Sequence, residues 1–319
     1  MNKSLKKVLK KVFSITDSHD HRGNHVQITI LGLKIFFLKP GVYLRRISMP
    51  FNRYKKNNVN ITSLPPIKGQ GRDIQLANLE ILKEIDYICR KNGLNYWLDF
   101  GTLLGAIRHK GFIPWDDDID LGMMRCDHDK LIEIFDKEKR NPDMYADYVI
   151  FYKWPKKAYL LRIKHKKCPN LFVDIFPYYN YSEKLTLEQQ LEKTKELKDY
   201  RQARMLELDP KTKNEIMQVN DIIRKEIVAD NCSEDNDLIW GSEFQHGWKN
   251  WIHSRDLIFP LQPIEFEGFS TFCANKYDEY LKDVYGDYMS YPEKITVAHN
   301  MYKTLSKEEK KVIKTLIKE

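Results

Sequence analysis

The sequence has few cysteines and no long apolar run. Its apolar stretches, such as residues 28–33 and 35–38, are too short to span a bilayer. The N-terminus lacks the apolar region and small-residue cleavage site of a secretory signal. The five cysteines are widely separated, which excludes a CxxC zinc signature and a disulfide framework and favours reduced thiols in a cytoplasmic protein. They are Cys89, Cys126, Cys168, Cys232 and Cys273.

The composition excludes a mainly disordered chain. Of the 319 residues, 42% are hydrophobic and 31% are charged, which is typical of a globular protein long enough for a full catalytic core. Lys and Arg number 53 against 45 Asp and Glu, so the net charge is +8. A basic balance favours anionic partners, such as phosphates, nucleic acid or an acidic membrane surface.

The first 68 residues differ from the rest. Residues 1–13 carry five lysines opposite an apolar stripe, which indicates either a basic amphipathic helix in peripheral contact with a membrane or a solvated tail. Residues 25–39 alternate in polarity and break at Leu31-Gly32, which predicts a small β-hairpin. Proline-rich residues 40–68 indicate a linker. We therefore expect an N-terminal segment, residues 1–68, and a catalytic domain, residues 69–319.

The sequence of residues 69–319 predicts an α+β fold. Helices and strands follow one another without regular βαβ alternation, so a mixed β-sheet flanked by helices, with helical additions, is expected. Asp127 is expected to cap a helix, and capping boxes are expected at Thr186 and Ser306. The predicted helices cover residues 73–92, 101–109, 186–206, 215–228 and 275–285, and the predicted strands cover residues 94–100, 119–123, 148–152, 158–163 and 171–176.

An acidic run leads into one of these strands. Asp118 and Asp120 are two residues apart, so on a strand both carboxylates would project from the same face, with Asp116 extending the run. Neighbouring carboxylates repel one another, and a divalent cation such as Mg²⁺ or Mn²⁺ removes the repulsion. A solvated acidic turn is the alternative, but the flanking apolar residues favour a metal site.

Two further segments sharpen this prediction. Gly101 and Thr102 stand at the start of a predicted helix, where free N–H groups and a glycine suit a phosphate. Asp174 lies among apolar residues on another predicted strand and needs a partner. A metal shared with Asp118 and Asp120 would supply one, and an ion pair with Arg162 is the alternative.

Basic and aromatic residues surround these acids in the sequence. Arg108, His109 and Lys110 lie between the glycine turn and the acidic run, where they would bind a diphosphate or form a solvated helix end. Arg162 precedes Asp174 and carries the same two interpretations. Trp115 would stack on a base or bind a quaternary ammonium group, unless it belongs to the core.

Residues 96–122, YWLDFGTLLGAIRHKGFIPWDDDIDLG, closely resemble the signature of the LicD family. Residues 172–177, and residues 266–268 with 277–289, resemble two further blocks of that family. The resemblance implies a nucleotidyltransferase-like fold in which Asp118, Asp120 and Asp174 hold the metal. An animal relative has a zinc ion held by cysteines, but the scattered cysteines of this sequence do not match that site, so no zinc is expected. His299 matches a histidine position of the family whose role is open.

The resemblance also implies an activity. Family members transfer a substituted phosphate, best known as phosphocholine from CDP-choline, onto a sugar hydroxyl of a cell-surface glycan and release CMP. Relatives that move ribitol phosphate make the transferred alcohol an open choice. Expected partners are therefore a CDP-linked donor and a glycan acceptor, in a bacterial cytoplasm, with no nucleic acid. An NTP-dependent nucleotidyltransferase on the same fold, and a basic nucleic-acid or membrane-binding module, are the alternatives.

Overall fold

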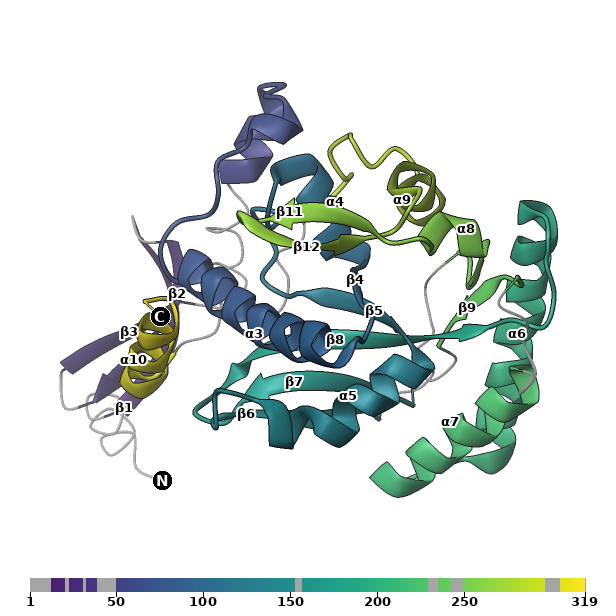
Figure 1. Cartoon of the computed structure of the whole chain (residues 1–319). Helices are drawn as coiled ribbons and strands as arrows, with labels where there is room; N and C mark the ends of the chain where they lie inside the picture. The colour runs from purple at the N-terminus through teal and green to yellow at the C-terminus, as the bar shows by residue number, and fades with distance from the viewer. Residues whose placement is uncertain are drawn as a thin grey trace.

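The computed structural model in Figure 1 describes residues 50–152, 157–228, 235–241, 249–295 and 305–318, together with the backbone of three N-terminal strands. Those strands, β1 (Phe13–Asp20), β2 (Gly23–Ile30) and β3 (Leu33–Leu38), form an antiparallel sheet in the order β1-β2-β3. The predicted hairpin is confirmed as β2–β3, and β1 was not predicted. The basic segment 1–13, expected as either an amphipathic helix or a solvated tail, lies outside the described residues except at Phe13, where β1 begins.

A seven-stranded mixed sheet forms the centre of the region after residue 68. Strand β8 pairs in parallel with β5, whereas the other pairings in this sheet are antiparallel. The order is β10-β9-β8-β5-β4, with β7 beside the first half of β8 and β6 beside β7. The strands are β4 (Trp97–Leu98), β5 (Asp120–Met124), β6 (Met144–Phe151), β7 (Ala158–His165), β8 (Cys168–Asn180), β9 (Leu238–Trp240) and β10 (Ile252–His253).

Helices flank this sheet, so the predicted α+β class is confirmed. In Figure 1, α3 (Gln70–Asn92) and α5 (Arg125–Glu138) lie across the sheet. Near β4, α4 (Phe100–His109) and α9 (Tyr277–Tyr285) gather with the hairpin formed by β11 (Gln262–Phe266) and β12 (Phe269–Cys273). No helix within the described ranges is long and apolar enough to cross a membrane. Also present are the short 3₁₀ helix η1 (Ile61–Ser63), α6 (Leu187–Leu208), α7 (Lys213–Ile227), α8 (Arg255–Ile258) and α10 (Lys307–Leu316).

Local sequence signals placed several helix ends correctly. Helix α3 ends at Gly93 in the left-handed conformation, as its Asn-Gly pair indicates. The capping boxes predicted at Thr186 and Ser306 are present at α6 and α10. The apolar stripe of α3, which includes Ile81 and Ile85, is fully buried against the sheet. Periodicity therefore predicted the layer that covers the sheet.

Three local predictions were wrong. The strand expected over residues 94–100 reduces to β4, because Asp99 caps α4 and its carboxylate accepts the N–H of Phe100. Asp118 lies in the loop before β5, since the strand begins at Asp120. Asp127 does not cap α5, which begins two residues earlier, and its carboxylate instead accepts the N–H of Asn95 at 3.0 Å.

Candidate active site

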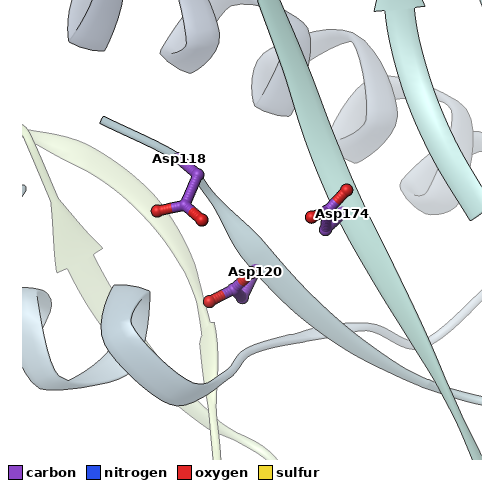
Figure 2. A group of neighbouring side chains, drawn as sticks. All are labelled: Asp118, Asp120 and Asp174. Carbon is purple, nitrogen blue, oxygen red and sulfur yellow. The ribbon is translucent and has the colours of Figure 1, made fainter. Parts of the chain in front are cut away.

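Three carboxylates converge where β5 and β8 run side by side. Asp118, Asp120 and Asp174 each offer one oxygen, and these oxygens all lie within 4.8 Å of one another. Figure 2 shows Asp120 and Asp174 on adjacent strands and Asp118 on the segment that leads into β5. The parallel register places Asp120 directly beside Asp174. The expected grouping of the three acids is therefore present, although Asp118 reaches it from a loop rather than from a strand.

A fourth carboxylate, Asp116, belongs to the same cluster. Burial and the neighbouring Asp118 raise the pKa of Asp116 well above its usual range. Burial, followed by the charges of Asp118 and Asp174, does the same to the pKa of Asp120. Each of these two acids therefore holds its charge only at an electrostatic cost, and a bound cation would remove that cost.

The first turn of α4 lies against the cluster. A Cβ atom placed on Gly101 would stand 3.4 Å from Asp116 Oδ2 and 3.9 Å from Asp120 Oδ2, so the missing side chain leaves space beside these acids. The backbone N–H of Asp120 donates to Thr102 Oγ1 at 2.8 Å. Thr102 is buried, and its hydroxyl oxygen therefore positions Asp120 in this structure.

Asp174 also makes the ion pair that the sequence left as an alternative. Arg162 lies opposite it on β7, donates from Nη2 to Asp174 Oδ2 at 2.9 Å and bonds the other oxygen through Nε. The guanidinium stands 3.8 Å from the centre of the Phe172 ring. Each carboxylate oxygen has two lone pairs, so this pairing leaves Asp174 able to bind a cation as well.

The basic residues at the C-terminal end of α4 have three different environments. Arg108 is only 5% exposed, and it donates to the carbonyl oxygen of Tyr288 at 2.7 Å and to His109 Nε2 at 3.0 Å. Burial and the charge of Arg108 lower the pKa of His109 to about 3. His109 is therefore a neutral acceptor for Arg108, not the additional cation that the sequence suggested. Lys110 is exposed at the left-handed end of α4.

Trp115 is buried rather than exposed to solvent. Its ring lies 5.3 Å from that of Phe51, and Arg108 lies 5.9 Å from the ring centre. Only 6% of the side chain is exposed, so packing accounts for most of its surface. Its predicted contact with substrate stays a prediction.

Sequence reasoning missed two residues next to the acids. Asp99 is fully buried and accepts hydrogen bonds from the hydroxyls of Tyr178, at 2.7 Å, and Tyr280. Tyr285 is close enough to the carboxylates to interact with them electrostatically: burial, followed by the charge of Asp120, raises the pKa of its phenol. The signal for Asp99 was an acid at a strand end, and that for Tyr285 was its place in a block resembling the LicD family.

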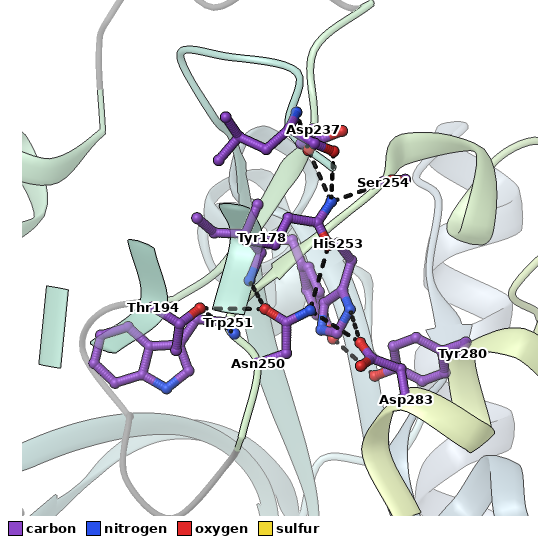
Figure 3. A network of polar contacts seen from close by, with 12 residues as sticks. Tyr178, Thr194, Asp237, Asn250, Trp251, His253, Ser254, Tyr280 and Asp283 are labelled. Atoms are coloured by element: carbon purple, nitrogen blue, oxygen red, sulfur yellow. Dashed lines mark hydrogen bonds and ion pairs between the residues drawn. The ribbon is translucent and has the colours of Figure 1, made fainter. Parts of the chain in front are cut away.

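Figure 3 shows a polar network that includes Tyr280, one of the two tyrosines whose hydroxyls donate to Asp99. His253 lies 3.2 Å from Asp283, and its ring contacts that of Tyr280 with centroids 5.2 Å apart. Asn250 donates to the Asp283 carboxylate at 3.0 Å. The network joins β10 to α9, which presents Tyr280 to Asp99.

The donor set fits a hard divalent cation. All the converging atoms are carboxylate oxygens, the ligands that Mg²⁺ and Mn²⁺ prefer. Arg162 is ion-paired with Asp174, and the neighbouring carboxylates add to burial in raising the pKa of Asp116 and Asp120. This crowding of acidic groups favours a bound metal, although the cluster does not define which one.

Comparison with known proteins agrees with this geometry. Residues 93–210 match the family described as LicD/FKTN/FKRP, nucleotidyltransferase domain. Lipopolysaccharide cholinephosphotransferase LicD of Haemophilus influenzae is 37% identical over 119 residues, which are 34% of this chain and 43% of the relative. Human ribitol 5-phosphate transferase FKRP is 34% identical over 89 residues, 27% of this chain and 17% of the relative. The match thus spans less than half the length of both curated relatives. Residues 93–210, the segment that matches the LicD family, contain the three converging aspartates.

Proposed function

We propose that the protein transfers a substituted phosphate, phosphocholine from CDP-choline as the first candidate, onto a sugar hydroxyl of a cell-surface glycan and releases CMP. The observation that carries the proposal is the convergence of three carboxylate oxygens beside the glycine-led start of α4. The named activities of the LicD and FKRP relatives supply the reaction class. CDP-ribitol and CDP-glycerol are the competing donors.

In this proposal Asp118, Asp120 and Asp174 hold Mg²⁺ or Mn²⁺, which would neutralise charge on the donor diphosphate. Gly101 leaves room for a phosphate oxygen near the helix start, and Arg108 binds an anionic group of the donor. An acceptor hydroxyl attacks the distal phosphorus, and CMP leaves with the electrons of the broken P–O bond. Asp116 and Asp174 are the two candidates for receiving the hydroxyl proton.

CMP release tests the proposal. The purified chain is incubated with Mg²⁺, a glycan acceptor and each of CDP-choline, CDP-ribitol, CDP-glycerol and CDP-ethanolamine. We expect CMP from one donor and its loss in Asp120→Asn, because that variant keeps the side-chain shape but removes a charged ligand. Asp136→Asn is the matched control, since this aspartate of α5 is 75% exposed. Undiminished CMP release by Asp120→Asn would refute the site.

An NTP-dependent nucleotidyltransferase is the second candidate, because the matched family is described by a nucleotidyltransferase domain. That enzyme would release pyrophosphate from an NTP, whereas the proposed one releases CMP from a CDP-linked donor. A pyrophosphate assay with the four NTPs separates them. Peripheral membrane contact through residues 1–13 is part of the proposal, and vesicle binding by the full chain would test it.

A further inference from the structure

Helix α3 carries two polar side chains on its buried face. Gln75 and Asn78 are 0% and 1% exposed, although they stand in a stripe of apolar residues. Burying an amide is costly unless its hydrogen bonds are made. Both side-chain amides donate to backbone carbonyl oxygens of the loop that carries Asp116 and Asp118, while Gln75 Oε1 accepts from Arg72 of the same helix.

Asn78 joins the two backbone segments that bear the acids. Its Nδ2 donates to the carbonyl oxygen of Asp117 at 2.6 Å, and its Oδ1 accepts the N–H of Phe172 at 3.0 Å. Asp117 stands between Asp116 and Asp118, and Phe172 precedes Asp174 by two residues on β8. One side-chain amide therefore bridges the acidic loop and β8.

Gln75 strengthens the acidic-loop end of this bridge. Its Nε2 donates to the carbonyl oxygen of Asp116 at 2.7 Å. Asp118 needs such support because it lies before β5 and lacks the strand pairing that orients Asp120. Helix α3 precedes residue 93, so this support comes from outside the segment that matches the family.

We propose that Asn78 is a positioning residue for the carboxylate cluster, setting the distance of the acidic loop, and so of Asp118, from Asp174. The inference rests on the proposed function in one respect, namely that the cluster binds a divalent cation. An amide is suited to the bridge because it donates on one side and accepts on the other, which neither a carboxylate nor an apolar side chain does at neutral pH.

The variant Asn78→Asp distinguishes a positioning role from a simple effect of charge, because the two predict opposite changes in cation affinity. Added negative charge near the cluster would by itself tighten binding of a divalent cation. If Asn78 positions the loop, binding weakens, because a carboxylate would repel the carbonyl oxygen of Asp117. We expect at least about a tenfold rise in the Kd for Mn²⁺, measured by titration calorimetry or by the EPR signal of free Mn²⁺, a change of about 1.4 kcal/mol.

Asn220→Asp is the matched control. Asn220 is a fully buried asparagine of α7 that donates to the carbonyl oxygen of Lys157 at 2.9 Å and accepts from Arg201 at 3.0 Å. It joins elements away from the cluster, so its variant should lose stability without changing the Mn²⁺ affinity. If Asn78→Asp fails to fold by circular dichroism, Asn78→Ala removes the same bonds without adding charge, and weaker Mn²⁺ binding is expected of it too.

The outcomes separate the two proposals. Equal or tighter Mn²⁺ binding by the folded Asn78 variant, with normal binding by the unchanged chain, overturns the positioning role alone. Absence of Mn²⁺ binding in the unchanged chain overturns the metal site, and with it both proposals. Weaker binding confined to the Asn78 variant supports the positioning role.

Discussion

Arg108 is a buried cation with neutral partners. It donates to a backbone carbonyl and to the uncharged His109, and it makes no ion pair with any carboxylate in the part of the chain that the structure describes. Burial lowers the pKa of its guanidinium well below its usual value, to about 10. Proteins rarely bury an unpaired charge without a use for it, and an anionic donor group would supply the missing partner.

The energetic consequence can be worked out for Arg108→Met. One pKa unit corresponds to about 1.36 kcal/mol, so the lowered pKa means that burial costs the charged form roughly 3 kcal/mol. Methionine removes that cost and keeps apolar contact with Trp115, but it leaves the buried Tyr288 carbonyl and the partly buried His109 Nε2 without their donor, at a combined cost of about 1–3 kcal/mol. We therefore expect the variant, without nucleotide, to be as stable as the unchanged chain or about 1–2 kcal/mol more stable.

Binding should change in the opposite direction. A charged hydrogen bond to a phosphate contributes about 1.5–3 kcal/mol, so Arg108→Met should weaken CDP-choline binding by one to two powers of ten. Urea unfolding and nucleotide-induced thermal shifts measure the two effects separately. The matched comparison is Arg72→Met, which should destabilise the protein, because Glu267 would lose the guanidinium that bonds both its oxygens at 2.8 and 2.6 Å. A large stability loss in Arg108→Met with unchanged CDP-choline binding would refute the reasoning.

Further predictions concern a glycine and an ion pair. Gly101→Ala should fold normally but lose most CMP release, because its methyl group meets no atom closer than 3.4 Å yet fills space beside the cluster. Gly105→Ala should instead fail to fold, as measured by circular dichroism, since its Cβ would lie 2.4 Å from the carbonyl oxygen of Gly111. Although burial opposes it, Arg72 lowers the pKa of Glu267 below 4.5, so the ion pair stabilises the fold above that pH and less as the pH falls further. Glu267→Gln should therefore unfold at a lower temperature than the unchanged chain at pH 7, by an amount that shrinks below pH 4.5; a constant difference would contradict this.

Local signals explain what the sequence could predict. Helix ends at Gly93, Thr186 and Ser306 follow from backbone hydrogen bonds made within a few residues, so tertiary contacts did not alter them. The grouping of Asp120 with Asp174 required two strands to be neighbours, and the resemblance to the LicD family supplied that long-range information. The register that places them side by side follows from the fold and not from either strand alone.

Long-range packing explains what the sequence could not predict. His109 reads as a possible cation, but burial beside Arg108 makes it neutral. Asn78 reads as a polar interruption of a helix stripe, and its function as a bridge appears only when its two partners, about 40 and 94 residues away, are brought together. Such residues carry no local pattern, because the requirement they satisfy arises between elements that are distant in sequence.

The chemistry and its placement come from different parts of the chain. Asp118, Asp120, Asp174 and Arg162, the ion-pair partner of Asp174, all lie within residues 93–210, the segment that matches the family. Elements outside that segment hold them in place. Helix α3 donates hydrogen bonds to the acidic loop. Glu267, in the turn between β11 and β12, accepts hydrogen bonds from Arg72 and from the N–H of Phe112. Helix α9 brings Tyr280 to Asp99. A carboxylate cluster stays assembled against its own repulsion only if its backbone is fixed from several sides, so the site requires the flanking elements as well as the matched segment.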